Sequence, residues 1–330
     1  MEENEALRLA RRMLDGERSA LARVLTLVEE QAPAAAHVMR FIQGHVGRAY
    51  TIGVTGPPGS GKSTLVDKLT LLIRRQGLTV GIVALDPSSP FSGGAILGDR
   101  IRMQSHTLDP GVFIRSLATR GSSGGLARAT RDTVRLLDAS GKDFCIVETV
   151  GVGQVELDIV DMADTVLVVS MPETGDSIQA MKAGILEIAD ILVVNKADLS
   201  GAERLSAYLE EMTRENQRHP WWQVPVVMTQ ASRNIGVDAL LSKVADHRRA
   251  LEASGEFLAR RRQRRAKELL EIVETKLKDR LRERATRNGR LSAVFRKVMD
   301  AEIDPHSAAV EILNESSLIR QWLLDENENA

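Results

Sequence analysis

The stretch Gly56-Pro57-Pro58-Gly59-Ser60-Gly61-Lys62-Ser63-Thr64 matches the phosphate-binding loop pattern G-x-x-x-x-G-K-[ST]. An apolar, β-rich run precedes it, and leucine and isoleucine residues at helical spacing follow it, which is the strand-turn-helix context that the motif requires. The glycines let successive N–H groups point into one concavity, which suits phosphate oxygens at a helix N-terminus. We expect all nine residues to bind a nucleotide, with Lys62 acting on the β- and γ-phosphates and the Ser63 hydroxyl binding Mg²⁺.

Short apolar runs alternate with helical patterns from residue 49 to about residue 252. The predicted strands are Tyr50–Val54, Thr79–Leu85, Val112–Leu117, Phe144–Val147, Thr165–Ser170, Ile191–Val194 and Val224–Met228. The predicted helices between them cover residues 62–76, 125–140, 178–188, 201–218 and 237–252. Near-continuous apolar strands that alternate with helices indicate an α/β fold with a doubly wound, mostly parallel sheet.

Helical patterns flank this region on both sides. Residues 1–46 predict a helical extension, residues 47–253 the nucleotide-binding domain, and residues 254–330 a C-terminal helical region. A long helix is predicted from Arg260, followed by shorter helices at about 291–301 and 305–313. The apolar stripe of the long helix makes a homodimer contact the expected role of these helices.

Composition narrows the classes of function. The 330 residues carry 44 basic and 45 acidic side chains, a balance that points neither to nucleic acid nor to a membrane surface. Cys145 is the single cysteine and lies in an apolar run, so we expect a small buried side chain rather than a nucleophile. No secretory leader and no apolar run long enough to span a bilayer is visible, so we expect a cytoplasmic protein.

A second motif, Asn195-Lys196-Ala197-Asp198, directly follows a predicted strand. The carboxylate of Asp198 can accept hydrogen bonds from the guanine N1–H and exocyclic amine, which adenine does not offer in that pattern. The Lys196 stem can cover the base while Asn195 braces the loop. The motif therefore predicts specificity for GTP and GDP, as bound nucleotides, over the adenine nucleotides.

Three carboxylates are candidates for the metal site beside Ser63. Asp86 ends a predicted strand and opens the loop that leads to Asp99. Asp99 could instead cap a helix that begins at Arg100. Glu148 ends another predicted strand, and we expect it to act in catalysis as well as at the metal.

Gly151 follows Glu148 by three residues and could turn its N–H toward the γ-phosphate, so we count it among the catalytic residues. GTP would then hold this loop and GDP would release it, as in the order–disorder switch of GTPases. Many small GTPases have Asp at the position of Glu148 and a water-orienting Gln directly after the Gly. Here Val152 follows, and the nearest glutamine is Gln154. We therefore expect slow intrinsic hydrolysis and a partner that completes the site.

With the phosphate loop, four further stretches resemble the MeaB/ArgK-type GTPases, which are G-protein chaperones of adenosylcobalamin-dependent acyl-CoA mutases such as methylmalonyl-CoA mutase. They are Leu85-Asp86-Pro87-Ser88-Ser89-Pro90, Gly93-Gly94-Ala95-Ile96-Leu97-Gly98-Asp99, Glu148-Thr149-Val150-Gly151-Val152-Gly153-Gln154 and Asn195-Lys196-Ala197-Asp198. The resemblance covers nearly the whole chain. It implies a P-loop NTPase fold, Mg²⁺ as cofactor, and a C-terminal dimerisation arm. It also implies GTP hydrolysis that gates the loading, protection and reactivation of the mutase cofactor.

The resemblance implies a function for one further loop, and the chain departs from the family pattern at two positions. By similarity, the loop with Asp176, Gln179 and Lys182 couples the nucleotide state to the mutase, although on the residues alone it reads equally well as a turn with Asp176 as N-cap. The family often has Leu-Gly-Gly where this chain has Ser123-Gly124-Gly125. Its base-contacting Ser-Ala turn is here Gln230-Ala231, whose Ala231 N–H would be available to guanine O6.

Two other functions share parts of this pattern. A nickel-insertion GTPase of enzyme maturation has the same fold, but it needs a Cys/His metal site, and the chain has one cysteine and six scattered histidines. A P-loop kinase or transport-linked ATPase is opposed by the Asn195–Asp198 motif and by the absence of a recognisable second substrate site. The mutase served is not specified by the sequence.

Overall fold

The computed structural model describes residues 3–30, 32–86, 106, 108–118, 123–149, 151, 158–172, 186–215, 219–286 and 289–314. The chain divides into two compact units, residues 1–258 and residues 259–330. The first unit contains the sheet, the phosphate loop and the N-terminal helices, and the second contains most of the long helix and two shorter ones.

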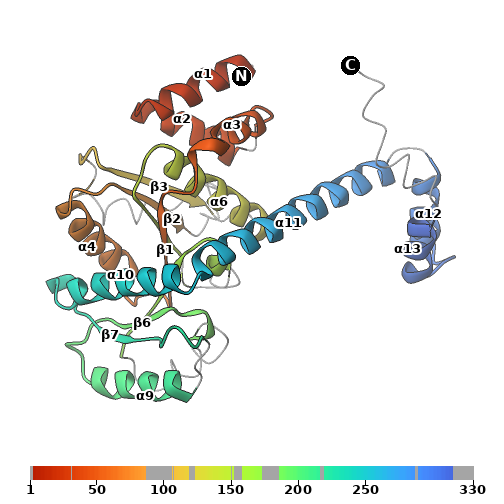
Figure 1. Ribbon diagram of the computed structural model, residues 1–330. Helices are drawn as coiled ribbons and strands as arrows, with labels where there is room; N and C mark the ends of the chain where they lie inside the picture. Colours follow the sequence, from red (N-terminus) through yellow and green to blue (C-terminus); the bar gives the residue numbers. More distant parts are fainter. Residues whose placement is uncertain are drawn as a thin grey trace. The chain divides into compact units, whose positions relative to one another are not determined.

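The first unit is built on a parallel sheet (Figure 1). In the described part of the chain this sheet has seven strands, in the order β3-β2-β4-β1-β5-β6-β7. The strands are β1 (Tyr50–Thr55), β2 (Val80–Asp86), β3 (Val112–Ala118), β4 (Phe144–Glu148), β5 (Thr165–Ser170), β6 (Ile191–Val194) and β7 (Val226–Met228). The strand β1 pairs with β4 on one side and β5 on the other, so the phosphate loop leaves the middle of the sheet. Ligands of open parallel sheets bind at such a point, beyond the carboxyl ends of the strands.

Buried apolar runs form the strands where the sequence predicts them. Both faces of β5 and β6 are covered, so every residue in them is buried and their predicted bounds agree with the structure. The strand β7 begins at Val226 rather than at the predicted Val224. Pro225 has no N–H for a ladder hydrogen bond, although its carbonyl still accepts one from Leu192.

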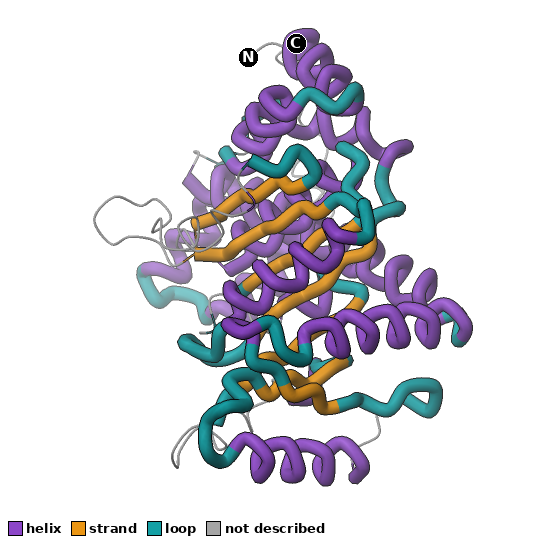
Figure 2. Tube along the Cα trace, turned by 90° about the vertical axis from the view of Figure 1, so that its left-hand side faces the viewer, coloured by secondary structure: helices purple, strands orange, loops and turns teal. Residues whose placement is uncertain are grey.

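Helices cover the two faces of the sheet (Figures 1 and 2). Alternate residues of the strands belong to the cores on opposite faces. One face packs against α4 (Lys62–Arg75) and α10 (Val237–Ala253). The other face packs against α6 (Ser123–Ala139) at one end and α9 (Ala202–Glu215) at the other. In β2, for example, Ile82 belongs to the first core and Val83 to the second.

The N-terminal helices pack on one another and on α6, so they belong to the same compact unit as the sheet. They are α1 (Glu3–Leu14), α2 (Arg18–Glu29) and α3 (Ala35–Ile42), followed by the 3-10 turn Gln43–His45. Two arginines join α2 to the edge strand β3. Arg18 of α2 donates to the carbonyl of Val112 at 2.9 Å, and Arg115 of β3 forms an ion pair with Glu29.

Two predicted helix boundaries differ from the observed ones for local reasons. The long helix α11 (Glu256–Thr286) begins four residues before the predicted Arg260. Gly255, with φ +78°, ends α10 in the left-handed conformation, and the chain becomes helical again at once. Of the helix predicted over 178–188, residues 186–188 form a 3-10 turn, and the rest lies outside the described residues.

In the second unit, α11 is followed by α12 (Arg290–Met299) and α13 (Pro305–Asn314), which pack against each other. The Asp304 carboxylate accepts a hydrogen bond from the Ser307 N–H at 3.0 Å and so caps α13. Apolar side chains are exposed on this unit, at Leu269, Leu270, Met299, Val310 and Leu313. Throughout the described ranges, each helix is too short or too polar to traverse a bilayer.

Candidate functional site

The candidate residues gather at the carboxyl edge of the sheet because the strands are parallel and neighbouring. The phosphate loop follows β1, Glu148 ends β4, Asp86 ends β2, and Asn195 follows β6. In the sheet order, β2, β4 and β1 are adjacent, and β5 separates β1 from β6. The fold therefore brings together four segments that are up to 140 residues apart in sequence.

Glycines shape the phosphate loop. Gly56, Gly59 and Gly61 have φ values of +139°, +78° and +91°, a region that favours glycine. A Cβ on Gly56 would lie 2.0 Å from the carbonyl oxygen of Val169 in β5. The loop therefore lies so close to the neighbouring strand that Gly56 cannot carry a side chain.

The side chain of Lys62 lies over the loop from which its helix begins. Its ammonium group donates to the carbonyl oxygens of Gly56 at 2.8 Å and Pro57 at 3.0 Å, and the side chain is buried. Gly151, with φ +94°, lies against the same atoms. A Cβ there would be 2.4 Å from Gly56 O and 2.8 Å from Lys62 Nζ. The segment after β4 thus touches the phosphate loop at its lysine.

A hydroxyl and a carboxylate meet beside this lysine. The Ser63 hydroxyl donates to Glu148 Oε1 at 2.6 Å, and both residues are buried. Among the described side chains, no group of three His, Cys, Asp or Glu residues is placed to hold a metal ion, so those described offer a cation here the Ser63 hydroxyl and the Glu148 carboxylate alone. Mg²⁺ in phosphate-binding sites is held in that manner, with nucleotide phosphates and waters completing its shell. The pair therefore fits the expected ion, and the backbone of Asp86 ends the strand beside Glu148.

Asn195 connects three loops through its side-chain amide. Its Nδ2 group donates to Ser60 O in the phosphate loop at 2.7 Å. Its Oδ1 atom accepts from the Thr229 hydroxyl at 3.0 Å and from the Ala231 N–H at 3.1 Å. Asn195 therefore braces the loops as predicted from its position. The sequence did not point to Ser60 O or Thr229 as its partners, although Thr229 directly precedes the Gln230-Ala231 turn.

This arrangement corrects one expectation. The Ala231 N–H is bonded to Asn195 Oδ1 rather than available to a base, because the loops after β6 and β7 approach each other closely. Gln230 exchanges two backbone hydrogen bonds with Ile235, which closes the turn containing the 3-10 segment Ala231–Arg233. In the Asn195 loop, Lys196 has φ +55° and is half-buried, while Asp198 is exposed.

Several candidate residues lie outside the described residues. These are Asp99, the coupling residues Asp176, Gln179 and Lys182, and Gln154. For Asp86 the structure describes the backbone alone.

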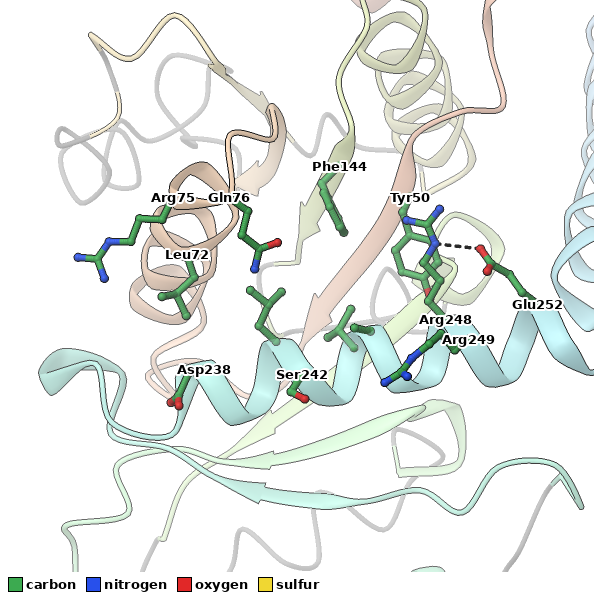
Figure 3. A pocket seen from close by; sticks show the side chains of 13 residues that line it. Tyr50, Leu72, Arg75, Gln76, Phe144, Asp238, Ser242, Arg248, Arg249 and Glu252 are labelled. Carbon is green, nitrogen blue, oxygen red and sulfur yellow. Dashed lines mark hydrogen bonds and ion pairs between the residues drawn. The ribbon is translucent and has the colours of Figure 1, made fainter.

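A groove of about 630 Å³ lies at the opposite, amino edge of the sheet, between α4 and α10 (Figure 3). Tyr50 and Phe144, the first residues of β1 and β4, line it with their rings 6.1 Å apart and edge to face. Arg248 lies over the Tyr50 ring and pairs with Glu252. None of the predicted site residues lines this groove.

Behind Tyr50 runs a buried chain of polar side chains. The Tyr50 hydroxyl and Thr165 Oγ1 are 2.6 Å apart, and Thr165 Oγ1 lies 2.7 Å from His247 Nδ1. His247 Nε2 lies 3.4 Å from Asp190 Oδ1, and the other carboxylate oxygen accepts the Val166 N–H. Burial raises the pKa of the Tyr50 hydroxyl well above its ordinary value, so this hydroxyl keeps its proton.

Comparison with known proteins identifies the family of the chain. A family model described as methylmalonyl-CoA mutase-associated GTPase MeaB matches residues 21–286. A relative from Pyrococcus abyssi is 50% identical over 312 residues, covering 93% of this chain and 95% of the relative. GTPase ArgK of Escherichia coli is 36% identical over 261 residues, covering 77% of this chain and 79% of that protein.

A solved structure described as a LAO/AO transport system kinase superposes with a TM-score of 0.71 at 26% identity, covering 95% of this chain and 98% of that one. Its likeness extends over both compact units of the chain. Since the family model covers most of the sequence and the strongest phosphate-loop and base-loop motifs fall within it, the chain belongs to the MeaB family of methylmalonyl-CoA mutase-associated GTPases.

Proposed function

We propose that this GTPase binds Mg·GTP at the carboxyl edge of its sheet and hydrolyses it to time the loading, protection and reactivation of an adenosylcobalamin-dependent acyl-CoA mutase. One observation carries the nucleotide part of the proposal. The ends of two other strands are bonded to the phosphate-loop motif: Glu148, the last residue of β4, through Ser63, and Asn195, which follows β6, through Ser60. A nucleotide on that loop would contact all of them.

The phosphates would lie on the loop Gly56–Thr64, at the start of α4, where backbone N–H groups and the helix dipole favour negative charge. Lys62 would exchange its bonds to the loop carbonyls for bonds to the β- and γ-phosphates. Ser63 and Glu148 would hold Mg²⁺, together with Asp86 and Asp99. The ion, when bound, neutralises charge on the β- and γ-phosphate oxygens.

The base would lie against the loop after β6. The exposed Asp198 carboxylate would accept from guanine N1–H and N2–H, and the Lys196 stem would cover the ring. Asn195 would keep this loop at a fixed distance from the phosphate loop. Gln230 and Ala231 would form the wall on the other side of the base through their loop, while the Ala231 N–H stays bonded to Asn195 Oδ1.

Hydrolysis requires water to attack the γ-phosphorus while the bond to the bridging oxygen of GDP breaks, which yields GDP and inorganic phosphate. Lys62 would stabilise the charge that develops on the transferred oxygens. Gly151, which touches Lys62 and Gly56, would place its backbone beside the same group, with Glu148 nearby. Since no glutamine directly follows Gly151, a partner would complete the orientation of the water.

The mutase is proposed as that partner because the family is described by its association with methylmalonyl-CoA mutase. We propose that the loop containing Asp176, Gln179 and Lys182 transmits the nucleotide state to it. We also propose that the exposed apolar residues of the C-terminal helices join two copies into a homodimer. The expected compartment is the cytoplasm.

The direct test measures GTP turnover with and without an adenosylcobalamin-dependent acyl-CoA mutase, using methylmalonyl-CoA mutase first. We expect slow release of phosphate from GTP alone and stimulation by the mutase of about tenfold or more. Turnover of GTP without stimulation by any such mutase would contradict the chaperone role and leave the GTPase intact. Preference for ATP would contradict the nucleotide assignment.

Base specificity has a sharper test in Asp198→Asn. An amide in place of the carboxylate can donate to the C2 carbonyl of xanthine but clashes in hydrogen bonding with the guanine amine. The variant should lose affinity for GDP by about a hundredfold and gain affinity for xanthosine diphosphate. The matched control, Asp238→Asn at the distant groove, should bind both nucleotides as the wild type does. Unchanged GDP affinity in Asp198→Asn would contradict the proposed base site.

A further inference from the structure

Two threonine hydroxyls are hydrogen-bonded to each other where the phosphate loop and the segment after β4 begin. Thr55 is the last residue of β1 and directly precedes Gly56, while Thr149 directly follows Glu148. The Thr149 hydroxyl donates to Thr55 Oγ1 at 2.9 Å, and both side chains are almost completely buried. The Thr149 N–H also donates to the carbonyl of Val54 at 3.0 Å. Thr149 is therefore bonded to β1 twice, through its backbone and through its side chain.

The neighbours of Thr149 on both sides contact the phosphate machinery. Glu148 accepts the Ser63 hydroxyl bond, and Gly151 lies against Gly56 and Lys62. Glu148 is thus bonded to Ser63, and Gly151, three positions further along the chain, lies against the lysine. Thr149, which directly follows Glu148, is held by its two bonds to β1. A small shift there would move Gly151 relative to the loop.

We propose that Thr149 is a positioning residue for GTP hydrolysis. The bond from its hydroxyl to Thr55 holds Gly151 within reach of the γ-phosphate. This inference rests on the proposed function of the site. Neither Thr149 nor Thr55 is proposed to contact the nucleotide or the attacking water. Their bond sets where the segment after β4 lies when the last phosphate is present.

Loss of the Thr149 hydroxyl should affect the binding of GTP and of GDP differently. GDP lacks the phosphate that Gly151 would contact, so its affinity depends on the phosphate loop and the base loop. Loss of the Thr149 hydroxyl should therefore slow hydrolysis and weaken binding of a non-hydrolysable GTP analogue, while GDP binding stays as it is. A residue that merely stabilises the fold would weaken both nucleotides together or neither.

The experiment compares Thr149→Val with Thr149→Ser in the full chain. Valine keeps the volume and removes the hydroxyl, whereas serine keeps the hydroxyl. We expect kcat for GTP to fall about tenfold in Thr149→Val, the effect of losing one typical hydrogen bond, and to recover to within about threefold in Thr149→Ser. The affinity for the imido analogue of GTP should fall similarly, with the affinity for GDP within about twofold of wild type.

Two further variants complete the test. In Thr55→Val the same bond is lost from the other side, so the double variant Thr55→Val/Thr149→Val should be no slower than the slower single variant. Thr133→Val removes a hydroxyl of α6 that is buried and has no hydrogen-bond partner among the described residues, and it should leave kcat unchanged.

Equal losses for GDP and the GTP analogue in Thr149→Val, or additive losses in the double variant, would overturn the proposal. So would a Thr149→Val enzyme as fast as the wild type. A wild-type protein without GTP turnover would instead contradict the proposed function itself, so the two failures are distinguishable.

Discussion

The two edges of the same sheet use polar side chains in opposite ways. At the carboxyl edge, Lys62 and Asn195 donate to carbonyl oxygens of a glycine-rich loop. At the amino edge, Tyr50, Thr165 and His247 bond mainly to other side chains in a buried chain. The first set can exchange its bonds for bonds to a ligand, while the second set has its groups engaged within the core.

The comparison indicates that burial alone does not mark a functional group. Lys62 and His247 are both buried polar residues. The lysine bonds to backbone carbonyls of the phosphate loop, whereas the histidine, which belongs to α10, bonds to Thr165 of β5. Substitutions of these polar side chains at the carboxyl edge should therefore alter turnover more than stability, and those at the amino edge the reverse. Four measurements would break or sharpen that contrast.

The largest expected effect belongs to Lys62→Met, which keeps an unbranched side chain that is one atom shorter and removes its charge. Loss of the proposed charge stabilisation should reduce kcat for GTP by about a thousandfold, while the thermal midpoint stays within a few degrees. Phosphate release and a thermal melt measure the two. The control Lys68→Met, on the same helix and bonded to Asp67, should retain turnover. A Lys62→Met enzyme as fast as the wild type would contradict the proposal that the carboxyl edge is the nucleotide site.

Gly56→Ala should be the most destabilising glycine substitution in the phosphate loop. Its Cβ would meet Val169 O at 2.0 Å at a φ of +139°, so we expect a loss of at least about 3 kcal/mol in the free energy of unfolding. Gly77→Ala, at the end of α4 with φ +79° and nothing within 4 Å, should cost only about 1 kcal/mol. Urea unfolding of both variants measures the difference. Similar losses would mean that the loop does not press on β5.

Thr165→Val tests the amino edge. It removes the hydroxyl between the Tyr50 hydroxyl and His247, leaving two buried polar groups short of a partner at a cost of about 2 kcal/mol. Turnover of GTP should stay within about twofold, in contrast to the expected loss in Thr149→Val. The unfolding free energy and kcat are measured on the same preparation. A stable but slow Thr165→Val enzyme would show that the two edges are coupled.

The smallest effect concerns pH and the ion pair between Asp109 and Arg74, which closes the amino edge beside β3. The hydrogen bond from Arg74 holds the pKa of Asp109 below its ordinary value. Because the folded pKa is depressed, this pair stabilises the protein fully above about pH 4, and its contribution disappears as the pH falls through the folded pKa. Asp109→Asn should lose less than about 1 kcal/mol at pH 7.

The check is the difference in unfolding free energy between wild type and Asp109→Asn, followed from pH 7 to pH 3. The difference should be constant down to about pH 4 and then shrink. A difference that grows as the pH falls would contradict the assigned direction of the pKa shift.

Much of the fold could be predicted from sequence because strands buried on both faces are continuous apolar runs. Thr165–Ser170 and Ile191–Val194 are examples in which the pattern and the ladder coincide. The position of the phosphate loop and of the Asn195 loop followed from motifs at strand ends. The predicted ends of strands and helices were wrong where a single residue altered the backbone hydrogen bonding or conformation, as at Pro225 and Gly255.

The partners of the polar side chains could not be predicted. Asn195 reaches Ser60, 135 positions away, and Thr149 reaches Thr55 across 94 positions. The sheet makes this possible because β4 is the neighbour of β1 and β6 is separated from β1 by β5 alone. The same approach occupies the Ala231 N–H, which the motif alone left open. At the amino edge, His247 and Asp190 carry no motif, so their network was invisible before the fold placed β5, β6 and α10 together.

The arginine that reaches from α2 to β3 has a consequence for solubility. Gly111 O accepts a bond from β2, so the next carbonyl, that of Val112, points outward from the rim of the sheet, where Arg18 covers it. The rim on the other side is only three residues long, in β7. Among the described residues β3 is paired on one side only, so without the N-terminal helices its seven residues would be open to strand addition by another molecule. These helices thus guard the protein against self-association into extended sheets.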